Sequence, residues 1–265
     1  MAQYADGKML ADVNDGIGRI TFNHPEKHNA MSIKMWSGLD QILDRFADSD
    51  DVRVVVLEGA GHKAFVSGAD ISQFGQQRAN AEAQKEYEQL TSAGRAKLAA
   101  FRKPILASIR GFCLGGGLGI AMQADLRIAA TNSQFGIPAA HLGIAYGFDM
   151  VRKLVSIVGP AHARMLLYTG QRIDSAAAER IGLINKVVPD DELSDTVAEL
   201  SRTIANNAPL SLWASKLAVN EAIKSCQERN VEAVQEAIAA CYDSTDYREG
   251  RTAFMERRTP RFQGR

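Results

Sequence analysis

The feature that most constrains the fold is residues 52–57, in which every side chain except Arg53 is apolar and most are β-branched. Such a run is typical of a strand that is buried on both faces of a parallel sheet. Further apolar strands are expected at residues 104–109 and Leu126–Ala130, and a charged, alanine-rich stretch over 81–101 is predicted to be helical. Parallel neighbours must be joined by crossovers, so the first half of the chain predicts an α/β arrangement with right-handed connections.

The flanking segments extend this pattern. Two short strands, Met9–Asn14 and Ile17–Phe22, are expected around the Asp15-Gly16 turn, and a helix is expected from Ser32, its predicted N-cap, to about Ala47. From about Val151 onward, helices are expected to follow one another. These predicted helices span residues 150–158, 160–168, 175–181, 191–205, 210–225, 231–242 and 244–257.

Composition excludes several function classes. The 265 residues contain 31 basic and 31 acidic side chains, and this balance predicts no nucleic-acid partner. No apolar run approaches the roughly 20 residues that span a bilayer, so no membrane association is expected. Three cysteines, Cys113, Cys226 and Cys241, lack metal-ligand spacing and are expected to be reduced thiols. The chain is therefore expected to be cytoplasmic.

A glycine cluster, Gly115-Gly116-Gly117, separates a predicted strand from a predicted helix. Glycine there lets the backbone amides approach a ligand closely. Neither phosphate-binding pattern fits, because no Gly-Lys-Ser/Thr follows and the last glycine, Gly119, comes one residue too early for a dinucleotide fingerprint. A tight structural turn is the alternative. The loop Ser67-Gly68-Ala69-Asp70 also follows a predicted strand. Two such loops could each direct a backbone amide at one oxygen, and this favours a binding role over a structural turn.

Several segments, in this order along the chain, resemble the enoyl-CoA hydratase/isomerase, or crotonase, superfamily. They are His24-Pro25-Glu26-Lys27-His28-Asn29-Ala30, Phe65-Val66-Ser67-Gly68-Ala69-Asp70-Ile71, Ile109-Arg110-Gly111-Phe112-Cys113-Leu114-Gly115-Gly116-Gly117, Phe135-Gly136-Ile137-Pro138 and Ala253-Phe254-Met255-Glu256-Arg257-Arg258. The resemblance implies a ββα spiral core over residues 1–195. It also implies a helical C-terminal region over 196–265 that packs on the core and on a neighbouring subunit of a homotrimer or a dimer of trimers.

The same resemblance implies roles for individual residues. The amides of Ala69 and Gly116 would form an oxyanion hole around a thioester carbonyl. The other residues would bind coenzyme A, which is part of the substrate, so that no separate cofactor is expected. These are Lys27 near the phosphates, Asp70, Ile71 and Ser72 along the adenine and pantetheine, and Phe254 and Arg257 reaching the site of a neighbouring subunit. For Lys27, Arg257 and Phe254, a surface or packing role is the alternative.

The sequence departs from the family where hydration needs its acid and base. The family's hydratases use two glutamates. The matching positions here are Gly119 and Ala139, and neither side chain can transfer a proton.

Other polar groups are candidates for proton transfer. Between Phe112 and Val151 the only carboxylates are Asp125, which is expected to be structural, and Asp149, which also fits a helix N-terminus. His141 has a structural alternative as well. Tyr146 resembles a tyrosine of the family's methylmalonyl-CoA decarboxylases, with lining the acyl pocket as its alternative role.

Two function classes follow. The first is an enzyme that passes through a thioester enolate, with decarboxylation or isomerisation favoured over ordinary hydration. The second is a non-catalytic acyl-CoA-binding or carrier protein, which would need only the intact binding loops. Turnover of acyl-CoA thioesters distinguishes the two.

Overall fold

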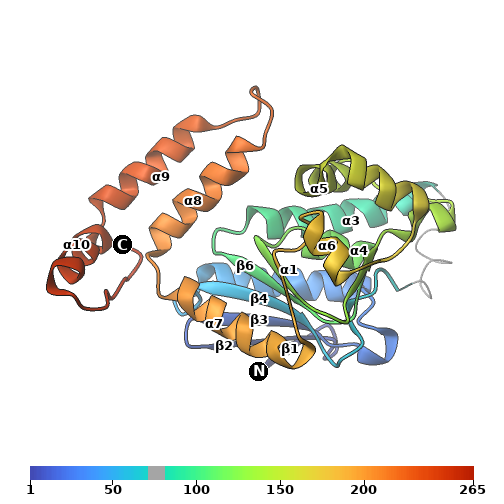
Figure 1. Ribbon diagram of the computed structural model, residues 1–265, viewed down its shortest axis with the longest axis horizontal. Coiled ribbons are helices and arrows are strands. Elements are labelled where there is room, and N and C mark those ends of the chain that lie inside the picture. Colours follow the sequence, from blue (N-terminus) through green and yellow to red (C-terminus); the bar gives the residue numbers. More distant parts are fainter. Residues whose placement is uncertain (71–80) are drawn as a thin grey trace.

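A large mixed sheet forms the centre of the computed structural model, which describes residues 1–70 and 81–265 (Figure 1). Within those residues the sheet has seven strands. In order across the sheet they are β1 (Ala2–Tyr4), β2 (Met9–Asn14), β3 (Ile17–Phe22), β4 (Val54–Gly59), β6 (Ile105–Ile109), β8 (Leu126–Ala130) and β11 (Lys186–Val188). The pairs β1/β2 and β2/β3 are antiparallel, and from β3 to β11 every pair is parallel.

A smaller sheet carries the glycine loops. Its described strands, in order, are β10 (Ile173–Asp174), β9 (Gln134–Gly136), β7 (Phe112–Leu114) and β5 (Ala64–Val66). Strands β5, β7 and β9 are parallel, so their carboxyl ends lie along one edge. The loops after β5 and β7 are therefore neighbours, as the sequence predicts.

Helices cover both sheets. In chain order the described α-helices are α1 (Ile33–Asp48), α3 (Ala81–Ala100), α4 (Gly116–Ala121), α5 (Phe148–Thr169), α6 (Ser175–Arg180), α7 (Leu193–Ala205), α8 (Pro209–Ala222), α9 (Val231–Asp243) and α10 (Thr245–Glu256). Short 3-10 turns occur at Pro25–Lys27, Pro138–Leu142 and Asp190–Glu192. Ser32 caps α1 as predicted, because its hydroxyl accepts a hydrogen bond from the Met35 amide.

The central strand β4 is buried on both faces, as predicted. Val54 and Val56 pack in one apolar cluster with Leu193 and Val197 of α7. Val55 and Leu57 point the other way, into the larger cluster that includes residues of α1 and α4. Alternate side chains of a strand point to opposite faces, which explains why the four buried residues from Val54 to Leu57 are all apolar.

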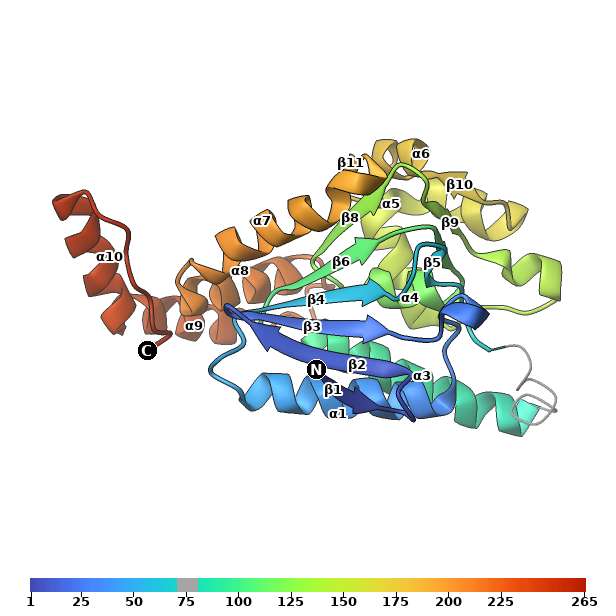
Figure 2. The same ribbon diagram turned by 90° about the horizontal axis from the view of Figure 1, so that it is seen from below.

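The end of the chain stands out from the body of the molecule. Helix α10 extends away from the sheets in both views, and α9 does so in Figure 1 (Figures 1 and 2), whereas α8 is held to the core by the pair between Lys216 and Asp125. Helix α7, by contrast, packs on the large sheet through Leu193, Val197 and Ala205. The division at residue 195 stays a prediction.

The expected α/β core and helical C-terminal region are confirmed, with two differences in the second half. Residues 150–158 and 160–168 form one element, α5, with a break at Gly159, where φ is +72°. The second difference is a pair of strands that the sequence did not predict among the helices after Val151. Strands β10 and β11 return to the two sheets, and each is so short that its pairing with a distant strand defines it.

Candidate active site

Two backbone loops meet at the edge of the small sheet. A β-carbon built on Gly68 would lie 3.9 Å from the Gly116 amide nitrogen, and one built on Gly116 would lie 3.9 Å from the Ala69 nitrogen. Gly115, between β7 and α4, has a φ of +53°, a conformation that favours glycine, and its amide donates to the Gly136 carbonyl. The predicted partners Ala69 and Gly116 are thus brought together.

Hydrogen bonds fix the first loop while leaving one amide available. The Met31 amide donates to the Gly68 carbonyl at 2.8 Å, and the Asp70 amide donates to the Met31 carbonyl at 3.0 Å. Gly116 is the first residue of α4, where amides have no acceptor inside the helix. Neither the Ala69 nor the Gly116 amide donates to any residue that the structure describes. Two preorganised N–H groups are therefore free to bind an oxygen.

These amides border a cavity of about 100 Å³. Its described lining residues are Met31, Trp36, Ser67, Gly68, Ala69, Tyr87, Glu88, Thr91, Arg95, Gly115, Gly116, Pro138, Leu142, Ile144, Ala145 and Tyr146. The wall is mainly backbone and apolar side chains, with a few polar groups, as in sites that bind small organic ligands.

Tyr146 is the one predicted proton-transfer residue among these lining residues. A β-carbon built on Gly115 would lie 3.0 Å from its phenol oxygen. The hydroxyl is therefore next to the oxyanion-hole loop.

His141 and Asp149 lie elsewhere. The His141 ring is exposed, and its Nε2 donates to the Thr169 carbonyl at 2.9 Å near the end of α5. Asp149 lines a separate groove of about 540 Å³ between α3, α5 and α8. Asp125 borders that groove too and has the structural role expected of it. It accepts from the Ile105 amide at 2.7 Å and from Lys216 Nζ at 2.8 Å.

Of the residues predicted to bind coenzyme A, Lys27 and Asp70 lie next to the cavity loop, whereas Phe254 and Arg257 lie far along the chain. Lys27 Nζ lies 2.8 Å from Asp70 Oδ2, directly after the Ala69 loop. Ile71 and Ser72 lie outside the described residues. Phe254, which is 81% exposed, and Arg257 belong to the end of α10, and neither lines the cavity of its own chain.

Sequence reasoning missed two charged residues of the cavity, Glu88 and Arg95 of α3. Arg95 Nη2 lies 2.8 Å from Glu88 Oε1, and both side chains line the cavity. Their seven-residue separation places them on one face of a helix, two turns apart. That spacing was the available signal, but the sequence does not show which face of α3 meets the glycine loops.

The thiol next to the site is not a candidate nucleophile. Burial raises the pKa of Cys113, which is fully buried in β7, so the reactive thiolate is disfavoured. All three cysteines are free. Among the described residues there is no cluster of three His, Cys, Asp or Glu able to hold a metal ion, and no helix long and apolar enough to cross a membrane.

Comparison with known proteins agrees with this geometry. The sequence model of the enoyl-CoA hydratase/isomerase family matches residues 12–265. The chain belongs to this family. It is 36% identical to a short-chain-enoyl-CoA hydratase of Clostridium acetobutylicum over 90% of this chain and 91% of that protein. It is 35% identical to a crotonyl-CoA hydratase of Syntrophomonas wolfei, over 96% and 97% of the two chains.

Solved structures of the enoyl-CoA hydratase/isomerase family share the fold. An enoyl-CoA hydratase/carnithine racemase from Magnetospirillum magneticum superposes with a TM-score of 0.93 at 32% identity, covering 97% of this chain and 96% of the other. An enoyl-CoA hydratase from Bacillus anthracis gives a TM-score of 0.92 at 29% identity, covering 97% and 100%. The crotonase fold expected from the sequence motifs is therefore confirmed.

The two positions that lack the family's carboxylates, Gly119 and Ala139, are both buried. A β-carbon built on Gly119 would lie 3.1 Å from Met150 Cε and 3.6 Å from Arg95 Cδ, so other side chains border this position. Ala139 is buried in the turn Pro138–Leu142. Glu88 is the carboxylate found among the described lining residues.

Proposed function

We propose that this chain is an enzyme that converts an acyl-CoA thioester through an enolate. The observation that carries the proposal is the pair of amides, Ala69 and Gly116, which lie close together at one small cavity and donate to no described residue. Each such donor, aimed at the oxygen where negative charge develops, is worth about 3 kcal/mol of transition-state stabilisation.

The proposed reaction is not addition of water by two glutamates. Hydration needs one group to activate water and another to protonate the α-carbon. Gly119 and Ala139 supply neither. Decarboxylation of a malonyl-type thioester and isomerisation of a double bond need less proton transfer and are the reactions that we favour. Tyr146, next to the Gly115 loop, is a candidate proton donor.

The assembly is part of the proposal. Lys27 and Asp70 would bind the coenzyme A portion beside the Ala69 loop. In a homotrimer or a dimer of trimers, Phe254 and Arg257 would reach the site of a neighbouring copy, which gives the projecting helices a surface to cover. We place the enzyme in the cytoplasm, and its three free cysteines support that location.

The test is turnover by the purified protein. Crotonyl-CoA, a 3-enoyl-CoA and methylmalonyl-CoA are supplied separately, and products are separated by chromatography and identified by mass spectrometry. Conversion of the 3-enoyl-CoA or of methylmalonyl-CoA is expected. Tight binding of all three without conversion would support the carrier function instead. Rapid hydration of crotonyl-CoA would contradict the inference drawn from Gly119 and Ala139.

A further inference from the structure

A carboxylate reaches the cavity from an element that carries none of the recognised motifs. Glu88 lies on α3, and its Oε1 would be 3.0 Å from a β-carbon built on Gly147. Gly147 follows Tyr146, whose hydroxyl lies against Gly115, and Gly115 precedes the oxyanion-hole residue Gly116. Glu88, Tyr146, Gly115 and Gly116 all line the cavity of about 100 Å³, so they border the same space that an acyl chain would enter.

Arg95 holds this carboxylate in place. Its guanidinium is largely buried, with 11% of the side chain exposed against 39% for Glu88, and it donates to Glu88 Oε1 at 2.8 Å. Charge-assisted hydrogen bonds of this kind orient a carboxylate firmly. The second oxygen, Oε2, accepts no hydrogen bond from a described side chain or amide. Glu88 thus has one oxygen fixed and one available to a substrate.

Arg95 also borders Gly119, the position at which the family's hydratases have a glutamate. The Arg95 Cδ atom would be 3.6 Å from a β-carbon at Gly119. A glutamate side chain at 119 would compete with Arg95 and Met150 for space. We therefore expect that the glycine at 119 leaves the space in which Arg95 can pair with Glu88.

We propose that Glu88 is the catalytic base and acid of this site, and that its reaction is migration of the double bond in a 3-enoyl thioester. This inference rests on the proposed function and specifies its reaction. Glu88 removes a proton from C2, and the C–H electron pair forms a dienolate whose oxygen is bound by Ala69 and Gly116. Protonated Glu88 then returns that proton to C4. The double bond comes to lie between C2 and C3, and the thioester carbonyl is restored.

One carboxylate is enough for this reaction, since the same proton leaves and returns and no water is consumed. Hydration would need a second acid–base group. Decarboxylation would bring the carboxylate of a malonyl-type substrate beside Glu88, and two like charges in one small cavity disfavour each other. Double-bond migration is therefore the reaction that a single carboxylate in the cavity can complete.

The experiment compares the wild-type protein with Glu88→Gln on 3-hexenoyl-CoA, following the absorbance of the conjugated 2-enoyl product. General acid–base catalysis is worth about 10²–10⁴-fold in rate. We expect kcat to fall by at least about 100-fold in Glu88→Gln. The dissociation constant for hexanoyl-CoA should change little, because the oxyanion-hole amides are untouched. Glu82→Gln, on an exposed position of the same helix, is the matched control and should keep wild-type kcat.

Arg95 is a positioning residue in this scheme. Arg95→Gln should lower kcat while leaving KM nearly unchanged, and Arg95→Lys should restore part of kcat because it can still donate to Glu88. Circular dichroism and hexanoyl-CoA binding show that each variant is folded.

The outcomes separate this inference from the proposed function. If Glu88→Gln isomerises 3-hexenoyl-CoA at the wild-type rate, the role of Glu88 is disproved and enolate chemistry stands. If the wild type decarboxylates methylmalonyl-CoA but leaves 3-hexenoyl-CoA unchanged, double-bond migration is disproved and enolate chemistry again stands. If the wild type converts no thioester, the proposed function fails, and this inference fails with it.

Discussion

At the scale of single residues, the site depends on a close approach of two backbones. A β-carbon built on Gly117 would lie 2.0 Å from the Val66 carbonyl oxygen and 2.7 Å from its carbon. These are main-chain atoms at the end of β5, so no side-chain rotation can relieve the contact. The first turn of α4 can reach β5, and place Gly116 beside Ala69, only because residue 117 is glycine.

Gly117→Ala should therefore destabilise the fold by about 3 kcal/mol, the upper end of what overpacking a core costs, because the small sheet and α4 must move apart. Urea denaturation followed by circular dichroism measures the change in the free energy of unfolding. Gly250→Ala in α10 is the matched control. Its nearest neighbour would be Phe262 Cε1 at an ordinary 3.4 Å, and little loss is expected. Equal stability of the two variants would contradict this account of Gly117.

The same scale shows what the sequence can and cannot predict about the site. Ala69 and Gly116 were predictable because each follows a strand in a glycine-rich loop. The local sequence of such a loop is enough to indicate that its backbone amides can approach a ligand. Glu88 and Arg95 were not, because they lie in a charged, alanine-rich helical stretch with no clear apolar face in the sequence. Their role depends on which face of α3 packs against the glycine loops, and only tertiary packing determines that face.

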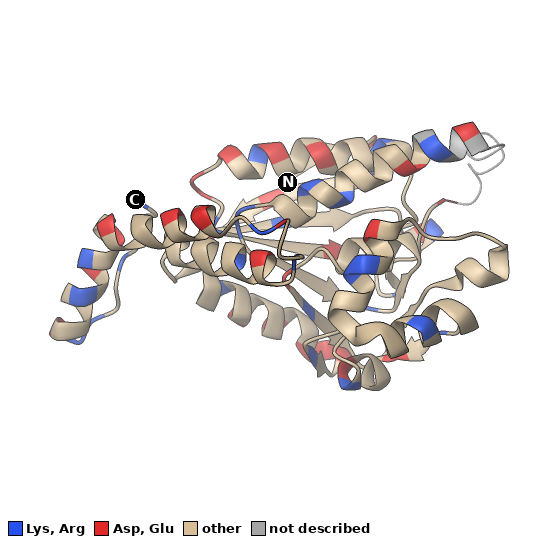
Figure 3. Cartoon of the chain, turned by 90° about the horizontal axis from the view of Figure 1, so that it is seen from above, with Lys and Arg blue, Asp and Glu red and all other residues tan. Residues whose placement is uncertain are grey.

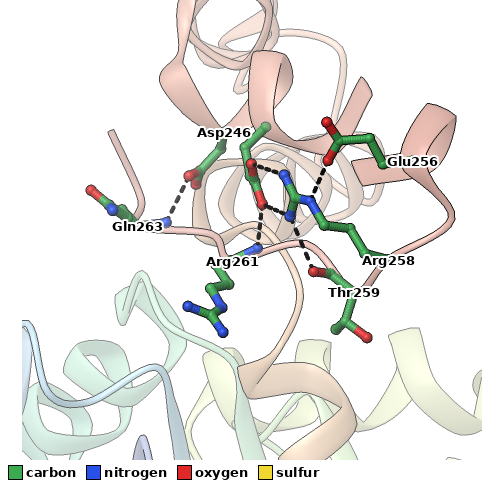
Figure 4. Close-up of polar contacts among 7 residues, drawn as sticks. Asp246, Glu256, Arg258, Thr259, Arg261 and Gln263 are labelled. Atoms are coloured by element: carbon green, nitrogen blue, oxygen red, sulfur yellow. Dashed lines mark hydrogen bonds and ion pairs between the residues drawn. The ribbon is translucent and has the colours of Figure 1, made fainter. Parts of the chain in front are cut away.

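At the scale of elements, the C-terminal segment is tied back to α10 by ion pairs and amides (Figure 4). Arg258 Nη1 and Nη2 lie 2.6 and 2.8 Å from the two Glu249 oxygens, and the Arg261 amide donates to Glu249 Oε1 at 2.8 Å. Asp246, buried at the start of α10, accepts from the Gln263 and Gly264 amides at 2.7 Å. Residues beyond α10 are thus ordered by two carboxylates.

The contacts of Glu249 with the C-terminal segment should weaken in acid. Hydrogen bonds from Arg258 and from the Arg261 amide lower the pKa of Glu249 from its usual 4.5 to about 2. A carboxyl whose pKa is lower in the folded state stabilises that state above its ordinary pKa. The stabilisation should decline as the pH falls from about 4.5 to about 2. NMR signals of residues 258–265 should then become those of a mobile chain before those of the core do.

Glu249→Gln provides the comparison for this prediction. The amide side chain cannot form the ion pair, so residues 258–265 should already be more mobile at neutral pH. An acid-induced change of the same size in Glu249→Gln and in the wild type would show that Glu249 is not the group responsible.

Element boundaries were largely predictable where local pattern determines them. Strands β2, β3 and β8 have their predicted bounds, and α1 begins directly after its predicted cap, Ser32. The short strands β10 and β11 were missed because hydrogen bonding to distant partners, rather than a run of β-branched residues, makes them strands.

At the scale of the whole molecule, charged side chains of both signs are spread over the surface, whereas large exposed apolar side chains gather on the last helices. Basic and acidic residues are interspersed over the face seen in Figure 3, in keeping with the balanced composition. The projecting helices α9 and α10 expose a set of large apolar side chains, Ile238, Tyr242, Tyr247, Phe254 and Met255. Exposed apolar patches of this kind mark surfaces for association.

We therefore expect sedimentation velocity to show a trimer or a dimer of trimers for the wild type. Phe254→Asp should shift the protein towards smaller species, because it puts a charge where the proposed contact with a neighbouring copy excludes water. Met165→Asp, an equally radical change at an exposed position of α5, should keep the wild-type assembly. A wild-type protein that sediments as a monomer at micromolar concentration would contradict the proposed assembly.

The central claim is that the Ala69 and Gly116 amides bind the thioester carbonyl, and infrared spectroscopy tests it most directly. Hexanoyl-CoA carrying ¹³C at the carbonyl is compared with unlabelled hexanoyl-CoA, free and bound, so that the difference spectrum isolates this one bond. Two donated hydrogen bonds weaken the C=O bond, so we predict that its stretching band moves to lower frequency on binding. A band unchanged from that of free hexanoyl-CoA, at saturating protein, would contradict the oxyanion hole.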